Sequence, residues 1–449
     1  MPKNAITDDK QRRRQWWAWY MYDFGNSAYA AVILLAVYAT YFKNVVVGGA
    51  QGAKLWGFAI GCAILVVEVL SPILGAMADF AASKKRLLFT FSALSWVFTA
   101  LLFFVQKGDV VMGFVFFVLA EIGYRSGQVF YNALLPEIAS ADEMGEVSGN
   151  GWAIGSVGGV VCLLFILPPI ILTKADPALN LVVVRGTYIF AALFFAVCAS
   201  QVFLHVKEAR KGRSLPPGET FLSIAIKRLA QTFREVRHFR QFMTFIVSFL
   251  VYNEGILMAL DFAAIIGAVL FGMTQTQLIL FMILVQVTSA AGAFLFGKLA
   301  EKTGFKKALL AALALMIAAV VWMIFNPSLI GYFVIGGLAG FALTGVQSLS
   351  RTMTGLFAPE SKSAEFFGFF AVAGQSLAFV GPITFGTLVA WLTTRYHASG
   401  LAALPAEQNS YRTALGMVAV FLLVGMGILL LVNEKRARQV AEEYTPAAD

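Results

Sequence analysis

Twelve long apolar runs constrain the fold of this chain more than any other feature of its sequence. A helix of about 20 mostly apolar residues is long enough to cross the hydrocarbon core of a bilayer. Only 13% of the residues are charged, whereas a soluble domain has about 25%. The runs therefore predict an all-α membrane protein with twelve membrane-spanning helices. They cover residues 17–42, 55–78, 87–105, 110–134, 150–173, 183–205, 242–271, 277–299, 307–325, 329–350, 366–392 and 411–433.

Basic residues predict the orientation of these helices. An even number of spans places both termini on one side of the membrane, and most of the 34 Lys and Arg residues fall on that side. Because basic loops remain cytoplasmic, we expect both termini in the cytoplasm. The net charge of +9 is then largely a topology signal, and we expect no nucleic-acid partner. The start of the chain does not resemble a cleavable signal peptide, so we expect a multi-pass protein of a bacterial inner membrane.

The chain divides into two apolar halves joined by a long polar connection. We expect a cytoplasmic N-terminus at 1–15, an N-terminal six-helix bundle at 16–205, a linker at 206–240, a C-terminal six-helix bundle at 241–434 and a cytoplasmic tail at 435–449. Two loops indicate that the halves are repeats. GAMADFAASKKR from Gly75 and GKLAEKTGFKK from Gly297 each have an acid, Asp79 or Glu301, four residues after the Gly, and a basic cluster beyond it.

The linker contains a predicted amphipathic helix. Its apolar residues recur at helical spacing, with Lys227, Arg228, Arg234 and Arg237 among them; they are Leu222, Ile226, Leu229, Phe233 and Val236. One interpretation is a helix that lies on an anionic leaflet. The other, which we favour from the sequence alone, is a tether between the two halves.

The repeated loops resemble the signature loop of the major facilitator superfamily. The second copy follows the G-xxx-D-K-x-G-K/R-K/R pattern with Glu301 in place of Asp, at Gly297, Lys302, Gly304, Lys306 and Lys307. The first copy departs from the pattern, because Phe80 stands at a basic position and no Gly follows. The resemblance implies the major facilitator fold, with two six-helix bundles and gating roles for Gly75, Asp79, Gly297 and Glu301.

Six further segments resemble signatures of the Atg22-like (UMF1) branch of that superfamily, in the expected order. They are YDFGNSAY from Tyr22, FYNALLPEIA from Phe130, SGNGWAIGSVGG from Ser148, YNEG from Tyr252, GVQSLSRTMTGLFAPE from Gly345 and AEFFGFF from Ala364. The departures are Phe24-Gly25 for Trp-Ala and Glu254 for the usual Asp. The fungal members are described as vacuolar amino-acid effluxers, so the resemblance implies a secondary transporter of small metabolites.

The first span carries polar residues where lipid-facing residues are expected. Asp23, Asn26 and Ser27 lie at i, i+3 and i+4 and share a helix face. A carboxylate in hydrocarbon needs a cavity or a partner. These residues are therefore candidates for binding a substrate or a proton. The alternative is that Asp23 caps or pairs at a helix end near the cytoplasmic surface.

The fourth span is the most polar. Glu121 and Arg125 are four residues apart, a spacing that suits an ion pair within one helix, and Asn132 follows two turns later. Arg125 would hold a substrate carboxylate while Glu121 exchanges a proton. The alternative is a static structural pair.

Other intramembrane acids extend the candidate pathway. In the seventh span, Asn253, Glu254 and Asp261 form a counterpart to the polar start of the first span. Glu68 is a protonatable group in an apolar setting and a candidate for proton coupling, or a residue bonded to a neighbouring helix. Arg351, at the end of the tenth span, is a gating candidate or an interfacial anchor, and Gly381-Pro382 predicts a kink in the eleventh span.

Enzyme and metal signatures are missing from the sequence. It has no Walker loop, GxSxG, HExxH or dinucleotide fingerprint, and its three Cys and three His residues form no cluster. We therefore expect no enzyme activity and no cofactor. The favoured function is secondary active transport of a small polar solute, an amino acid or short peptide, by alternating access with protons or another coupling ion. The alternatives are a lipid-like or amphiphilic substrate, or a non-transporting receptor or scaffold. We expect a monomer with a small-molecule substrate and lipids as its partners.

Overall fold

The computed structural model describes residues 9–80, 84–139, 143–208, 220–359 and 362–443. Within these ranges the chain is helical, and twelve helical spans are long and apolar enough to cross a membrane. This confirms the predicted all-α fold with twelve spans. The spans are Gln11–Val47, Gly49–Met77, Lys84–Phe104, Val110–Ile138, Glu146–Leu172, Pro177–His205, Arg240–Phe271, Gln275–Thr303, Phe305–Phe325, Leu329–Phe357, Glu365–Ala398 and Ala403–Leu430.

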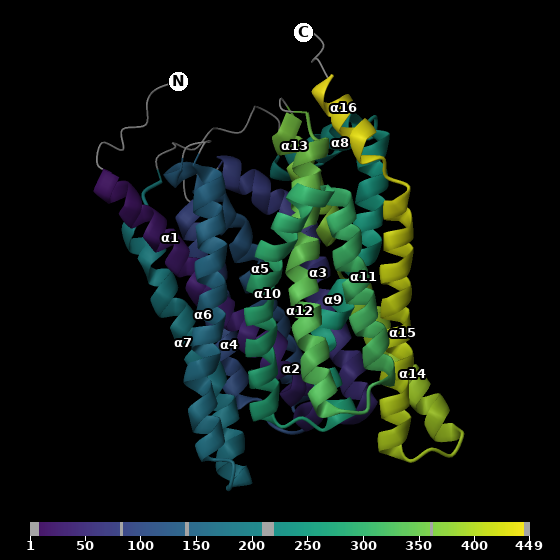
Figure 1. Ribbon diagram of the computed structural model, residues 1–449. Helices are drawn as coiled ribbons and strands as arrows, with labels where there is room; N and C mark the ends of the chain where they lie inside the picture. The colour runs from purple at the N-terminus through teal and green to yellow at the C-terminus, as the bar shows by residue number, and fades with distance from the viewer. Residues whose placement is uncertain (1–8, 81–83, 140–142, 209–219, 360–361, 444–449) are drawn as a thin grey trace. The chain divides into compact units, whose positions relative to one another are not determined.

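The helices of the first half of the chain are labelled in Figure 1. They are α1 (Asp9–Tyr29), the π-helix η1 (Ala30–Ala36), α2 (Tyr38–Tyr41), the π-helix η2 (Phe42–Val47), α3 (Gly49–Phe80), α4 (Lys84–Leu101), the 3₁₀ helix η3 (Leu102–Phe104), α5 (Val110–Ile138), α6 (Met144–Leu172) and α7 (Pro177–His205). The second half contains α8 (Phe221–Val236), α9 (Arg240–Phe271), α10 (Gln275–Thr303), α11 (Phe305–Phe325), α12 (Leu329–Phe357), α13 (Ser363–Ser376), α14 (Val380–Ala398), α15 (Ala403–Leu430) and α16 (Glu434–Glu442).

Residue contacts divide the chain into two compact units. Unit 1 contains described residues from 1–48, 62–226 and 275–279, and unit 2 those from 49–61, 227–274 and 280–449. The units are not continuous in sequence. The first residues of α3 belong to unit 2, and the first residues of α10 belong to unit 1.

In unit 1, α1 packs along α6 and α7, while α4 packs against α5 and α7. Glycines let α6 come close to α1. A Cβ added at Gly158 would lie 2.0 Å from the carbonyl oxygen of Phe24, and one at Gly151 would lie 2.3 Å from the Trp19 ring. Backbones approach this closely only through small residues, so the glycine-rich segment from Ser148 folds against the polar segment from Tyr22.

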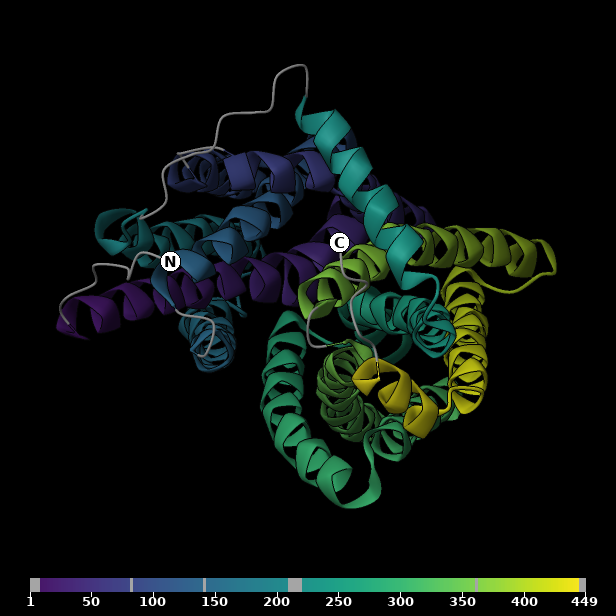
Figure 2. The ribbon, with the colours of Figure 1, turned by 90° about the horizontal axis from the view of Figure 1, so that it is seen from above.

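In unit 2, α9 lies among α12, α13, α14 and α15, as the end-on view of Figure 2 shows. In Figure 1, α12 and α15 run lengthwise beside it, and α11 packs against both of these helices. Close approach again depends on glycine, since a Cβ at Gly425 of α15 would lie 2.6 Å from the Cβ of Tyr252. Tyr252 also bonds Ser350 across the unit at 2.7 Å between hydroxyl oxygens.

Two spans depart from the continuous helices that the sequence predicts. The first span widens into η1 and η2, and Gln275 Nε2 donates to the carbonyl of Ala36 at 2.8 Å, beside the junction between η1 and α2. The eleventh span, expected to be one helix over 366–392, ends at Ser376 and restarts at Val380. Pro382 explains the break, because its ring has no N–H and would clash with the carbonyl four residues earlier.

Candidate functional site

A buried ion pair forms the centre of a polar cluster in unit 1. Arg125 Nε and Glu121 Oε1 are 2.5 Å apart on successive turns of α5. The Glu121 side chain is fully buried, and that of Arg125 is 24% exposed. The spacing predicted this pair correctly, although pairing alone does not decide between a structural and a functional role.

Side chains from α1 and α3 surround the pair. The ring of Tyr29 stacks on that of Tyr124, with centroids 4.6 Å apart, and both tyrosines are within electrostatic reach of Glu121 and Arg125. Glu68 of α3 is also within electrostatic reach of Arg125. The structure therefore brings Glu68, Glu121 and Arg125, predicted from separate stretches, into one neighbourhood.

Asp23 extends this cluster along α1. Asn26 Nδ2 donates to Asp23 Oδ1 at 3.4 Å. Tyr124 and Tyr131 both lie within electrostatic reach of the Asp23 carboxylate. Gly155 of α6 makes room for this carboxylate, because a Cβ there would lie 2.3 Å from Asp23 Oδ2. Asp23 is thus part of the buried cluster and not a surface cap.

Several buried polar atoms of the cluster lack a hydrogen-bond partner of normal geometry among the described residues. They are Asn26 Oδ1, Tyr29 Oη, Glu68 Oε1, Glu121 Oε2 and Tyr131 Oη. Folded proteins leave few such atoms unsatisfied, and water or a bound ligand is the usual explanation. Five of them, from α1, α3 and α5, indicate a place for a polar solute, water or protons.

The remaining predicted residues of unit 1 are less enclosed. Ser27 is half-buried on the same face of α1 as Asp23, and Asn132 is exposed at the far end of α5. The structure does not place Asn132 in the buried part of the cluster.

In unit 2, Glu254 caps a helix, a role that the sequence did not predict. Its Oε2 accepts a hydrogen bond from the backbone N–H of Gly381 at 2.8 Å, and the side chain is buried. Gly381 is in the first turn of α14, so Glu254 caps the helix that restarts after the break. Asn253 donates to the carbonyl of Gly374 at 3.4 Å in the preceding helix α13.

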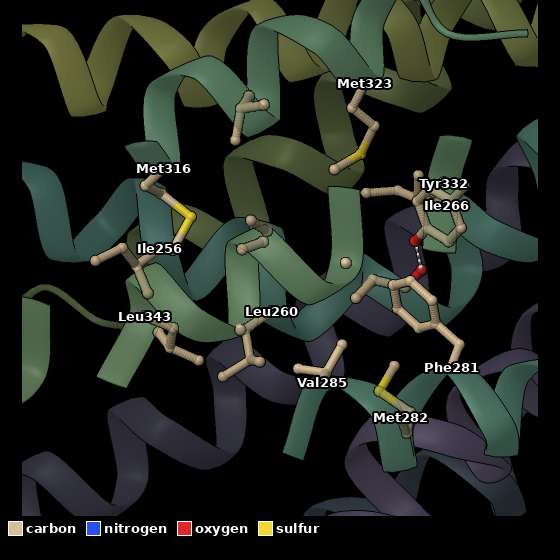
Figure 3. A pocket seen from close by; sticks show the side chains of 16 residues that line it. Ile256, Leu260, Ile266, Phe281, Met282, Val285, Met316, Met323, Tyr332 and Leu343 are labelled. Atoms are coloured by element: carbon tan, nitrogen blue, oxygen red, sulfur yellow. Dashed lines mark hydrogen bonds between the residues drawn. The ribbon is translucent and has the colours of Figure 1, made fainter. Parts of the chain in front are cut away.

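Asp261 is buried on α9, and its backbone carbonyl accepts from Trp56 Nε1 at 3.0 Å. Next to it, α9, α10, α11 and α12 enclose an apolar cavity (Figure 3). The hydroxyl of Tyr332, at one end, donates to the Ala263 carbonyl at 2.7 Å. The thioethers of Met282, Met316 and Met323 line other sides, and such side chains adapt to irregular apolar shapes.

The predicted gating residues make few contacts. A Cβ at Gly75 or Gly297 would meet nothing within 4 Å, so neither glycine serves a close helix approach. Glu301 and Arg351 are exposed. The side chain of Asp79 lies outside what the structure describes.

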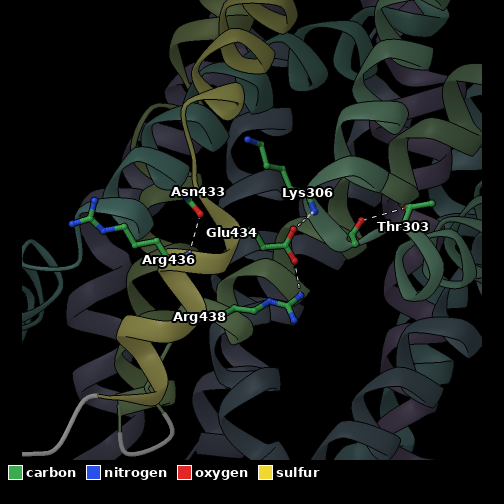
Figure 4. A network of polar contacts seen from close by, with 7 residues as sticks. Thr303, Lys306, Asn433, Glu434, Arg436 and Arg438 are labelled. Atoms are coloured by element: carbon green, nitrogen blue, oxygen red, sulfur yellow. Dashed lines mark hydrogen bonds and ion pairs between the residues drawn. The ribbon is translucent and has the colours of Figure 1, made fainter.

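The contacts near these segments come instead from lysines of the basic clusters and from acids that were not among the predicted gating residues. Lys306 Nζ donates to the carbonyls of Leu430 and Val432, at 2.8 and 2.7 Å, at the end of α15. Glu434 Oε2 accepts from the backbone N–H of Lys306 at 3.1 Å, and its Oε1 pairs with Arg438 at 2.5 Å (Figure 4).

Unit 1 contains the same arrangement. Lys85 Nζ donates to the carbonyls of Phe203 and Val206, at 2.8 and 2.6 Å, and the backbone N–H of Lys85 donates to Glu208. A lysine in the first turn of one helix, α4 or α11, thus binds the C-terminal end of a second helix of its unit, α7 or α15. The signal that could have revealed this was present, since Val-x-Glu follows both helices, at Val206 and at Val432.

Known proteins are similar to this chain in sequence. The family model described as vacuole effluxer Atg22 like matches residues 53–442. An uncharacterized MFS-type transporter, YxiO of Bacillus subtilis, is 24% identical over 95% of this chain and 96% of its own length. Autophagy-related protein 22 of Yarrowia lipolytica is 20% identical over 72% of this chain, which spans 56% of that protein.

Solved structures show the same fold. A bacterial homologue of the human lysosomal transporter Spinster, in an inward-facing and unoccupied conformation, superposes with a TM-score of 0.72 at 17% identity, covering 98% of this chain and 100% of that one. A mutant of the nucleoside transporter NupG gives 0.70 at 10% identity, covering 94% and 99%. The twelve spans and these similarities define a multi-pass membrane protein with the fold of the major facilitator class. Within that class, the chain belongs to the Atg22-like family.

Proposed function

We propose that this protein is a secondary active transporter that moves a small polar solute, preferably an amino acid or a short peptide, by alternating access with protons as the coupling ion. The observation that supports this most strongly is the set of buried polar atoms that lack a hydrogen-bond partner of normal geometry in the described part of the cluster, those of Tyr29, Glu68 and Glu121 at the ion pair and those of Asn26 and Tyr131 near Asp23. A purely structural ion pair does not require tyrosine, asparagine and glutamate side chains to remain unsatisfied beside it.

The chemistry of the cluster suits a zwitterion and a proton. Arg125 is its cation, and Asp23, Glu68 and Glu121 are its acids. A guanidinium binds a carboxylate well, so a substrate carboxylate competes with Glu121 for Arg125. Once displaced, the fully buried Glu121 lacks its counter-charge and is stable only when it binds a proton. Substrate binding and proton binding are then linked at one residue.

Unit 2 contributes a second titratable position. Glu254 holds the first turn of α14 through Gly381, and a neutral side chain would hold this positive helix end less strongly. We propose that Glu254 and Asp261 belong to the pathway and that the break between α13 and α14 moves during the cycle. The Gly75–Asp79 and Gly297–Glu301 segments, near the C-terminal ends of α3 and α10, remain the proposed gates together with Arg351, and we propose that both termini lie in the cytoplasm of a bacterial cell.

A second candidate substrate class is amphiphilic. The apolar cavity bounded by Ile256, Phe281, Met316 and Tyr332 would accept a hydrocarbon portion better than a polar solute.

Counterflow in liposomes tests the proposal. Purified protein is screened by thermal shift against amino acids, dipeptides, sugars and lysolipids, because a bound ligand stabilises the folded state. The solute that stabilises most is then exchanged across liposomes that contain the wild type or Arg125→Met. We expect exchange by the wild type and none by the variant. Equal exchange by both would remove Arg125 from the mechanism, and stabilisation only by lysolipids would favour the amphiphilic class.

A further inference from the structure

Helix α8 exposes the face that an amphipathic helix normally buries. Leu222, Ile226 and Phe233 recur at i, i+4 and i+11, which places them on one side of the helix. They are 52%, 57% and 51% exposed. A helix that served only as a tether on the protein would turn these side chains inward.

Most contacts of α8 with the protein come from the opposite side, although the ring of the half-exposed Phe233 also lies 6.1 Å, centroid to centroid, from that of Phe369 in α13. Glu235, which the helical repeat places on the far side from this apolar stripe, pairs with Lys362 at 2.5 Å between Oε2 and Nζ. Ile224, also away from the stripe, is buried at 8% exposure. Just beyond the helix, the ring of Phe239 packs against that of Phe366 with centroids 4.9 Å apart. These contacts fix the rotation of α8 and keep Leu222 and Ile226 outward.

Two observations identify what covers the stripe. The exposed basic residues Arg234 and Arg237 flank it, while the acid of this helix, Glu235, pairs with Lys362 on the other side. The helix also ends at Val236, only a few residues before Arg240, where the membrane-spanning α9 begins. The C-terminal end of α8 is therefore held at the membrane boundary, with apolar and basic groups available to a lipid surface.

We propose that Leu222, Ile226 and the exposed part of Phe233 lie in the surface of an anionic leaflet, with Arg234 and Arg237 on the lipid headgroups. The linker is then a lipid-binding element and not only a tether. This assignment corrects the preference drawn from the sequence alone, and it does not depend on the identity of the transported solute.

Spin labels test the proposal in the full-length protein. The native cysteines Cys62, Cys162 and Cys198 are free and are replaced by Ser, and a single label is attached after Ile226→Cys. A label after Gln231→Cys, exposed on the other side of α8, is the matched control. Each protein is reconstituted with phosphatidylcholine alone or with added phosphatidylglycerol. Accessibility is measured to oxygen, which concentrates in lipid, and to a water-soluble nickel chelate.

With phosphatidylglycerol, the ratio of oxygen to nickel accessibility is expected to be several-fold higher at 226 than at 231. Reversing the charges with Arg234→Glu and Arg237→Glu is expected to lower the ratio at 226 towards that at 231, while an unchanged melting temperature, followed by tryptophan fluorescence, shows that the bundles remain folded. Equal ratios at 226 and 231, or a label at 226 shielded from both reagents by protein, would overturn the proposal. An unchanged ratio without phosphatidylglycerol would overturn its anionic part.

Discussion

Replacing Arg125 alone should lower the stability of this protein more than replacing both Glu121 and Arg125. In Arg125→Met, the fully buried Glu121 loses its partner at 2.5 Å, and breaking a buried ion pair from one side costs about 3–5 kcal/mol. Glu121→Gln costs less, because the Arg125 side chain is 24% exposed and retains some hydration. Replacing both by Gln and Met leaves no buried charge at this position, and such exchanges are often neutral or stabilising.

Thermal unfolding in detergent, followed by the fluorescence of the eight tryptophans, gives the order of stabilities. We expect Arg125→Met to be the least stable and the double variant to recover most of the loss. Counterflow separates stability from function, because the recovered double variant still lacks the cation and should not exchange solute. If the double variant is as unstable as Arg125→Met, the reasoning from the buried charge is wrong. If it exchanges solute like the wild type, the pair is only structural.

Three further outcomes follow from local geometry. Gly155→Ala should lower the stability of the folded protein by about 1–3 kcal/mol through overpacking, because its Cβ would lie 2.3 Å from Asp23 Oδ2. It should also impair solute exchange. The control is Gly149→Ala, whose Cβ would meet nothing within 4 Å. Lys306→Met should increase hydrogen exchange at the start of α11, because charge-assisted bonds contribute about 1.5–3 kcal/mol; unchanged exchange would contradict this role. Hydrogen bonds from Lys362, the largest effect, and from Glu365 and Gln231 lower the pKa of Glu235 from 4.5 to about 2, so the contribution of this carboxylate to stability is present above pH 4.5 and is lost as the pH falls towards 2. The protection of α8 amides against hydrogen exchange, corrected for the intrinsic effect of pH, should therefore be equal at pH 7 and pH 5, and a loss of protection between them would refute the assignment.

The sequence predicted the membrane fold because hydrophobic length is a strong signal. All twelve apolar runs coincide with spans, since a helix that crosses lipid must satisfy its own backbone polar groups. The break in the eleventh span was harder to place. Pro382 predicted a kink. The gap before Val380 also depends on Glu254 of α9, whose carboxylate caps the N-terminal end of α14.

The site was predicted only in part, because spacing along the chain reports contacts within one helix but not contacts between helices. The i, i+4 spacing of Glu121 and Arg125 determines their pairing within one helix. The approach of Glu68 and Tyr29 to this pair depends on packing between helices, which spacing along the chain does not encode. The lysine contacts at the ends of α7 and α15 were missed because their acceptors are backbone carbonyls, which leave no trace in residue identity.

The most direct test of the proposed mechanism is solute accumulation driven by a pH gradient in liposomes that contain Glu121→Gln. Glutamine keeps the size of the side chain and a hydrogen-bonding group near Arg125 but cannot exchange a proton. If Glu121 couples substrate to protons, this variant still exchanges solute by counterflow but does not accumulate it when a pH gradient is imposed, whereas the wild type does. Accumulation by Glu121→Gln at the wild-type level would contradict the proposed coupling.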